Sequence, residues 1–199
     1  PEMSRGLGDV YKRQPHDMDN FIAAIGGKKE LETRLDTLFT TSSQIDGAEA
    51  SGDITGLIGQ YAHGNEPSHH MAYLYNWTDS PWKGQGYLDY IMQNFYTNEP
   101  DGIIGNEDCG QMSAWYLFSV MGFYPVCPGT DEYVLGAPYL PYLKLKLPNG
   151  NTLEIKAPGV SDKKRYVQSL KLNGKVYDKM YITHEDICLL YTSPSPRDI

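Results

Sequence analysis

The 199-residue sequence lacks a long apolar run, has few cysteines and carries fewer basic than acidic residues. A helix needs about 20 consecutive apolar residues to cross a bilayer, so the sequence predicts no membrane span. Lysine and arginine number 17 against 25 aspartates and glutamates, and the net charge is -8. Nucleic-acid-binding surfaces are rich in lysine and arginine, so this balance argues against such a partner.

The three cysteines do not form a disulfide framework that can be read from the sequence. Cys109 opens a predicted helix and Cys127 follows it, which leaves the two thiols far apart along the helix axis unless the chain folds back. Cys188 lies in a terminal segment that we do not expect to be native. The cysteines therefore indicate no redox compartment.

Both ends of the chain read as translated sequencing adapter. Asp9–Gln14 corresponds to the DNA end that a library-preparation transposase recognises, and Cys188–Arg197 corresponds to the reverse complement of the longer adapter, read out of frame. We therefore expect residues 1–14 and 188–199 to be non-native tails without tertiary contacts. Such segments are left out of reasoning about the fold.

The apolar periodicity changes along the rest of the chain. Helical spacing dominates residues 15–128, for example at Leu31, Leu35 and Leu38. From Asp131 onward apolar residues alternate with lysines, and Asn-Gly pairs mark hairpin turns. We expect an α+β chain in which a helical unit, residues 15–128, precedes an antiparallel β unit, residues 129–187.

Acids, amides and aromatics crowd together between Gly105 and Tyr116, where a predicted helix begins. One interpretation is a capping box, in which Asp108 and Gln111 satisfy free N–H groups at the helix start. A cap needs one acceptor, however, and Asn106, Glu107 and Asp108 are three adjacent side chains with oxygen atoms. A polar ligand is the alternative, and a carboxylate at a rigid helix start suits activation of a water molecule.

Three histidines fall within residues 63–70, just before a helix that we expect to begin near Pro67. His69 and His70 are adjacent and point in different directions on a helix, whereas zinc sites favour histidines three or four residues apart. Hydrogen-bonded histidines at a domain face are the alternative. Glu66 also has a structural interpretation, as an acid in the first helical turn.

Taken together, the motifs resemble the calcium-dependent exo-acting α-mannosidases of glycoside hydrolase family 92. The segments that carry the resemblance are Pro15-His16-Asp17, Gly64 to His70, Tyr73 to Asn76, Pro81-Trp82-Lys83, Gly105 to Tyr116 and Gly122 to Val126. It covers about Pro15 to Ile187 and implies the C-terminal part of a longer protein. It also implies that the helical unit is part of an (α/α) toroid and that the β unit belongs to an antiparallel β-sandwich.

The resemblance implies hydrolysis of terminal α-linked mannose with inversion of configuration. Inversion needs a general acid and a general base roughly 6.5–9.5 Å apart. Asp108 stands at the matching position of the base, and Asn106 stands where some relatives carry an acid. The general acid of the family would lie just before Pro15, where adapter sequence stands, so we expect this chain to be inactive alone.

The resemblance further implies a calcium ion that binds sugar hydroxyls, in a secreted or periplasmic protein that acts on N-glycans or mannans of α-1,2 or related linkage. The expected calcium ligands are Asn65, Glu66 and Asn106, because Ca²⁺ prefers oxygen atoms. The expected sugar contacts are Glu66, His69, Glu107 and Trp115. Two alternatives remain open, a non-catalytic carbohydrate-binding module and a calcium-independent glycosidase on a helical toroid.

Overall fold

The computed structural model describes residues 15–44, 54–161 and 163–189. Most of the two predicted tails, including Tyr11 and Leu190, lies outside these ranges. Cys188 is described, and its carbonyl accepts hydrogen bonds from the side-chain amides of Asn149 at 2.7 Å and Asn151 at 2.6 Å. The expectation of a tail without tertiary contacts is therefore wrong at its first residue. Cys188 belongs to the last turn of a helix, whose carbonyls lack intrahelical donors and here obtain them from a neighbouring turn.

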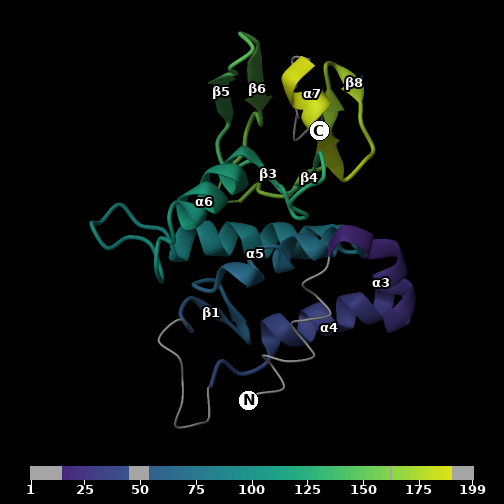
Figure 1. The fold of residues 1–199 in the computed structure, drawn as a ribbon, viewed down its shortest axis with the longest axis vertical. Helices are drawn as coiled ribbons and strands as arrows, with labels where there is room; N and C mark the ends of the chain where they lie inside the picture. The colour runs from purple at the N-terminus through teal and green to yellow at the C-terminus, as the bar shows by residue number, and fades with distance from the viewer. Residues whose placement is uncertain (1–14, 45–53, 162, 190–199) are drawn as a thin grey trace.

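Helices dominate the first part of the chain (Figure 1). The helical elements are η1 (Pro15–Asp17), α3 (Met18–Ile25), α4 (Lys28–Thr40), η2 (Glu66–Ser68), η3 (Met71–Trp77), α5 (Pro81–Asn94) and α6 (Gln111–Met121). Local signals explain their ends. Asp17 accepts a hydrogen bond from the Asn20 N–H at the start of α3, Pro81 occupies the first turn of α5, and Gly122 ends α6 with φ 92°.

The helix expected from near Pro67 is not a single α-helix. The 3₁₀ helices η2 and η3 replace it, and His69 and His70 lie between them. The backbone bonds here span three residues, as from the Tyr73 N–H to the His70 carbonyl at 3.0 Å. Residues 71–75 are all buried, so this segment has no solvent-facing side that would favour an amphipathic α-helix.

Short antiparallel strands make up the rest. Those of the β part are β3 (Phe123–Tyr124), β4 (Glu132–Leu135), β5 (Tyr142–Lys146), β6 (Thr152–Lys156), β7 (Lys171–Leu172), β8 (Lys175–Val176) and β9 (Tyr181–Thr183), with the helix α7 (His184–Leu189) at the end. β4 is central between β3 and β9, while β5–β6 and β7–β8 are hairpins. Gly150 and Asn173-Gly174 adopt positive φ in the two hairpin turns, as their sequences predict. The α+β prediction is confirmed.

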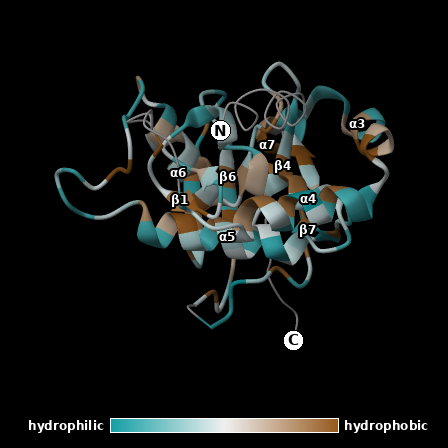
Figure 2. Ribbon diagram, turned by 90° about the horizontal axis from the view of Figure 1, so that it is seen from below, coloured by the Kyte–Doolittle hydropathy of each residue, from teal (hydrophilic) through white to brown (hydrophobic). Residues whose placement is uncertain are grey.

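Two apolar clusters hold these parts together. The larger joins α3, α4, η3, α5 and α6 around fully buried side chains such as Leu31, Leu74 and Ile91. The smaller joins β3, β6, β9 and α7 around Leu153 and Ile155. Hydrophobic segments accordingly gather where helices and strands meet, and the protruding loops are mostly hydrophilic or neutral, with short hydrophobic stretches (Figure 2). The unit boundary at residues 128 and 129 stays a prediction.

Candidate active site

Residues 64–70, the first motif, and residues 105–116, the second motif, meet through a pair of glycines, Gly64 and Gly105. A Cβ atom added to Gly105, whose φ is +77°, would lie 3.0 Å from the Gly64 Cα atom and 3.1 Å from the Thr55 hydroxyl oxygen. A Cβ atom on Gly64 would lie only 2.0 Å from that same hydroxyl. Only glycine allows this close approach of two backbones. The structure therefore brings Asn65, next to Gly64, close to Asn106, next to Gly105.

The loop that carries the second motif connects α5 to α6 and begins as a small hairpin. Residues Thr97 and Gly102 pair through a backbone hydrogen bond of 2.8 Å, and Ile104 donates to Phe95 at 3.1 Å. A further antiparallel pair, β1 (Leu57–Ile58) and β2 (Tyr61–Ala62), leads into the first motif. Asn65, Asn106, Glu107 and Asp108 are exposed, while Glu66 is half-buried.

Glu107, and not Asp108, caps helix α6. The Glu107 carboxylate accepts hydrogen bonds from the N–H groups of Gly110 and, at 3.2 Å, Ser113. Hydrogen bonds from the Ser113 side chain and backbone, with that from Gly110, hold the pKa of Glu107 below its usual value. The capping-box interpretation of Asp108 is therefore wrong, because Gly110 occupies the N-cap position and the adjacent acid supplies the acceptor.

Asp108 occupies an unusual backbone conformation. Its φ is 51° and that of Cys109 is 56°, both in the left-handed region that residues with a Cβ atom avoid. Each such residue costs on the order of 1–3 kcal/mol and persists only where its surroundings enforce it. Within the described ranges, the Asp108 side chain has no hydrogen-bond partner. The strained turn thus presents a carboxylate that the fold itself does not use.

Two predicted sugar contacts are buried instead. The exposed fraction is 1% for His69 and 0% for Trp115. The Trp115 indole donates to the His69 carbonyl at 3.0 Å, and both ring nitrogens of His69 lie against protein groups. This geometry contradicts a direct sugar contact for either ring, because both fill the core beneath the loops. The contacts expected for Glu66 and Glu107 stay predictions.

Another buried histidine, His63, links the elements beneath the site. Its ring lies 2.8 Å from the Tyr61 hydroxyl and 2.7 Å from the Tyr96 hydroxyl. Burial, with a smaller effect of His69, lowers the pKa of His63 to about 2, so the ring is neutral. His63 belongs to the histidine cluster that is visible in the sequence. Its partner Tyr96 lies 33 residues away, and no local sequence pattern marks Tyr96 as that partner.

The oxygen atoms of this site are of the kind that calcium binds. Asn65, Glu66 and Asn106 offer amide and carboxylate oxygens, and the Thr55 hydroxyl beside Gly64 is buried without a hydrogen-bond partner. The described part of the chain contains no group of three His, Cys, Asp or Glu side chains that could hold a metal ion. An ion here would therefore depend on amide and hydroxyl oxygens beside Glu66, which suits calcium better than zinc.

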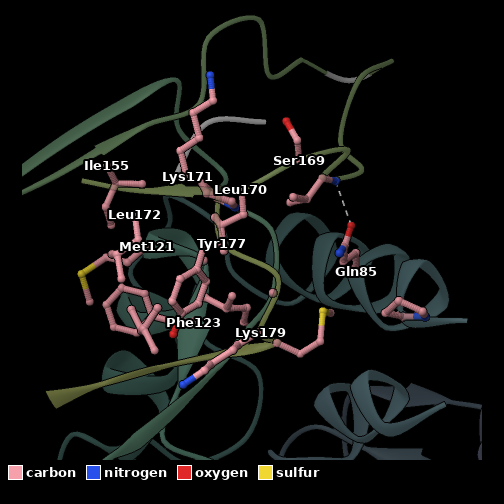
Figure 3. Close-up of a pocket in the computed structure, with 18 of the residues that line it drawn as sticks. Gln85, Met121, Phe123, Ile155, Ser169, Leu170, Lys171, Leu172, Tyr177 and Lys179 are labelled. Atoms are coloured by element: carbon pink, nitrogen blue, oxygen red, sulfur yellow. Dashed lines mark hydrogen bonds between the residues drawn. The ribbon is translucent and has the colours of Figure 1, made fainter. Parts of the chain in front are cut away.

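An apolar cavity of about 230 Å³ lies elsewhere, between α6, the β strands and residues 167–172 (Figure 3). Met121, Phe123, Ile155 and Tyr177 are among its lining residues. None of the predicted site residues lines it, and it lacks the cluster of acids and amides on the motif loops. Its chemistry does not suit it to hydrolysis of a sugar.

Comparison with known proteins identifies the family. The sequence model of the glycosyl hydrolase family 92 catalytic domain matches residues 11–189. The chain belongs to this family. Among the described residues, no helix has the length and apolar character needed to cross a membrane.

Three relatives illustrate the likeness. The GH92 α-mannosidase BT3965 from Bacteroides thetaiotaomicron is 44% identical with a TM-score of 0.77, over 88% of this chain and 22% of its own. The GH92 inverting mannosidase BT2199 from the same species is 34% identical with a TM-score of 0.75, over 90% of this chain and 25% of its own. An uncharacterized secreted glycosidase from Arthroderma benhamiae is 28% identical over 86% of this chain and 20% of its own length. The chain therefore spans about a fifth of the relatives it matches.

Proposed function

We propose that this chain forms the C-terminal part of an inverting exo-α-mannosidase and contributes its general base, Asp108. The observation that carries the proposal is the exposed Asp108 carboxylate on a strained turn, free of the capping role that Glu107 fills. The likeness to BT3965, whose structure is also known in complex with mannoimidazole, supports an α-mannoside substrate. The likeness to BT2199 supports inversion.

The chemistry follows from the position of this carboxylate. Asp108 takes a proton from a water molecule, whose oxygen attacks the anomeric carbon on the face opposite the leaving group. The bond from the anomeric carbon to the glycosidic oxygen breaks, and a general acid protonates that oxygen. We propose that this acid comes from sequence upstream in a longer protein, so the present chain is inactive alone. Asn106 cannot accept the proton; its amide NH2 group donates to water or sugar, while its oxygen is left for the calcium ion proposed below.

We also propose a calcium ion held by Asn65, Glu66 and Asn106, which have oxygen-bearing side chains and lie on the two loops that the glycine contact brings together. When bound, the ion supplies positive charge that orients sugar hydroxyl groups. Glu66 is half-buried and is the single carboxylate of this set. The substrates we propose are mannose-containing glycans, such as N-glycans or mannans of α-1,2 or related linkage. We propose secretion or a periplasmic location, and the secreted relative from Arthroderma benhamiae supports secretion.

The first test compares this chain with a version extended upstream, each with calcium and with a chelator. The substrates are an aryl α-mannoside and mannobiose, and sugar binding is measured in parallel by calorimetry. Turnover by the extended protein alone, lost with chelator, supports the proposal. Sugar binding by the short chain without turnover by either protein would instead indicate a carbohydrate-binding module. Turnover that survives the chelator would refute the calcium proposal.

The role of Asp108 is tested by Asp108→Asn in the extended protein. Asparagine tolerates a left-handed conformation, so the turn should persist while its side chain can no longer take a proton from water. We expect kcat to fall by roughly 10²–10⁴-fold with mannose affinity retained. Asp101→Asn is the matched control, because Asp101 is exposed in the same loop. Near-normal turnover in Asp108→Asn would reject Asp108 as the base.

A further inference from the structure

The contacts of His63 define a directed chain of hydrogen bonds beneath the site. The Tyr96 hydroxyl lies 3.2 Å from the Met112 carbonyl, which can only accept, so Tyr96 donates to it. Tyr96 then accepts from the Nε2–H group of His63 at 2.7 Å. The Nδ1 atom of His63 is left without a proton and accepts from the Tyr61 hydroxyl at 2.8 Å. One tautomer of His63 therefore satisfies all three bonds.

A second chain starts from the same residue. The His63 carbonyl accepts from Nε2–H of His69 at 3.0 Å, which leaves Nδ1 of His69 as an acceptor. The Gln111 side-chain amide donates to that atom at 3.2 Å and to the Tyr124 hydroxyl at 3.1 Å. The two histidine rings stack with their centroids 4.7 Å apart. His63 is thus the point where both chains meet.

Both chains end on the first turn of α6, at Gln111 and Met112. The backbone N–H groups of these two residues donate back to the carbonyls of Asp108 and Glu107, each at 3.2 Å. The strained left-handed turn at Asp108 is therefore hydrogen-bonded directly to the start of α6. His63 connects that helix start to Tyr61 in β2 and to Tyr96 just after α5. Without either chain of hydrogen bonds, the helix start would be free to shift and the turn to relax.

We propose that His63 is a positioning residue, which holds the strained Asp108 turn in place through Tyr96–Met112 on one side and His69–Gln111 on the other. For its catalytic consequence, this inference rests on the proposed function of Asp108 as the general base. His63 touches neither substrate nor water, because its exposed fraction is 0%. His63 belongs to the group of three histidines within residues 63–70, and in this proposal it supports the base structurally and does not bind a metal ion.

The first test reads the turn itself by NMR in the 199-residue chain. Left-handed residues give a strong contact between their own amide and α protons, which reports the conformation of Asp108 and Cys109. We expect Tyr96→Phe, which removes one hydroxyl and keeps the ring, to weaken this signal and to speed amide exchange at Gly110 at least tenfold. Tyr73→Phe is the matched control, since Tyr73 is buried and its hydroxyl bonds to Ser119 in the last turn of α6, at 2.9 Å, far from the helix start.

The second test uses turnover of an aryl α-mannoside by the extended protein. We expect Tyr96→Phe and His63→Phe to lower kcat at least tenfold, with KM changed less than twofold. His63→Gln should recover part of kcat, and Tyr73→Phe should match the wild type. An unchanged Asp108 turn in Tyr96→Phe overturns the positioning role whatever the activity. If the wild-type extended protein lacks mannosidase activity, the proposed function is overturned. If Tyr96→Phe nevertheless relaxes the Asp108 turn, the positioning role of His63 is still established.

Discussion

Glu107 caps helix α6 and the neighbouring Asp108 carboxylate does not, and the pH dependence of stability can test this difference. Because the folded pKa of Glu107 is depressed, its contribution to stability is present above the ordinary value of 4.5 and is lost as pH falls through the lower folded value. We expect Glu107→Gln to lower the free energy of unfolding at pH 7 and to approach the wild type near pH 3. Urea unfolding at the two pH values measures this, with Glu99→Gln as the control. An equal loss at both pH values would contradict the capping role.

Glu66 is tested at the same scale by Glu66→Gln in the extended protein. The change removes the single charge of the proposed calcium ligands, and ligand charge sets the affinity of such sites. We expect KM or the calcium concentration for half-maximal activity to rise roughly tenfold, equivalent to about 1.4 kcal/mol, with little change in kcat at saturation. Activity titrations against calcium measure both values. Unchanged values would remove Glu66 from the site.

At the scale of elements, the contact between the two motif loops depends on Gly105. Gly105→Ala places a methyl group at positive φ against the Gly64 backbone. The left-handed backbone costs about 1–2 kcal/mol and the overpacking about 1–3 kcal/mol more. Gly150→Ala is the matched control, because its φ is +87° and nothing lies within 4 Å of the added Cβ atom. Urea unfolding should show a larger loss for Gly105→Ala, and equal losses would contradict the close approach of the loops.

Local signals in the sequence were enough for most elements. The spacing of Leu31 and Leu35 predicted α4, and the Asn-Gly pairs predicted the β5–β6 and β7–β8 hairpins, because both patterns depend on residues near one another. The break between η2 and η3 was missed, since burial of residues 71–75 on all sides depends on packing of α4, α5 and β4 against η3.

The same distinction applies to the site. The adjacency of Asn106, Glu107 and Asp108 was visible in the sequence, but which carboxylate caps α6 was not, because the choice depends on φ at Asp108 and Cys109. Burial of His69 and Trp115 likewise arises from segments 42 and 46 residues apart. Motif resemblance indicates a candidate site, and only the packing separates its exposed residues from the buried ones that support the loops.

At the scale of the whole molecule, the chain spans about a fifth of its relatives and has an apolar cavity of about 230 Å³ beside α6 (Figure 3). Leu170 and Leu172 line this cavity and are only half-buried. Each large apolar side chain that stays in water loses up to about 1.5–3 kcal/mol of the stabilising free energy that burial would provide. We therefore expect the isolated chain to be marginally stable and the extended protein to be more stable.

An apolar fluorescent dye tests this expectation in the isolated chain. The dye should brighten in the cavity, and Leu170→Asp should remove most of that signal because it places a charge on the apolar lining. Val176→Asp is the control, since Val176 is 84% exposed and lies outside the cavity lining. Calorimetry should show a broad, low-temperature transition for the chain and a sharper, higher one for the extended protein. A sharp cooperative transition of the chain alone, without dye binding, would show that its apolar surface is already adequately buried.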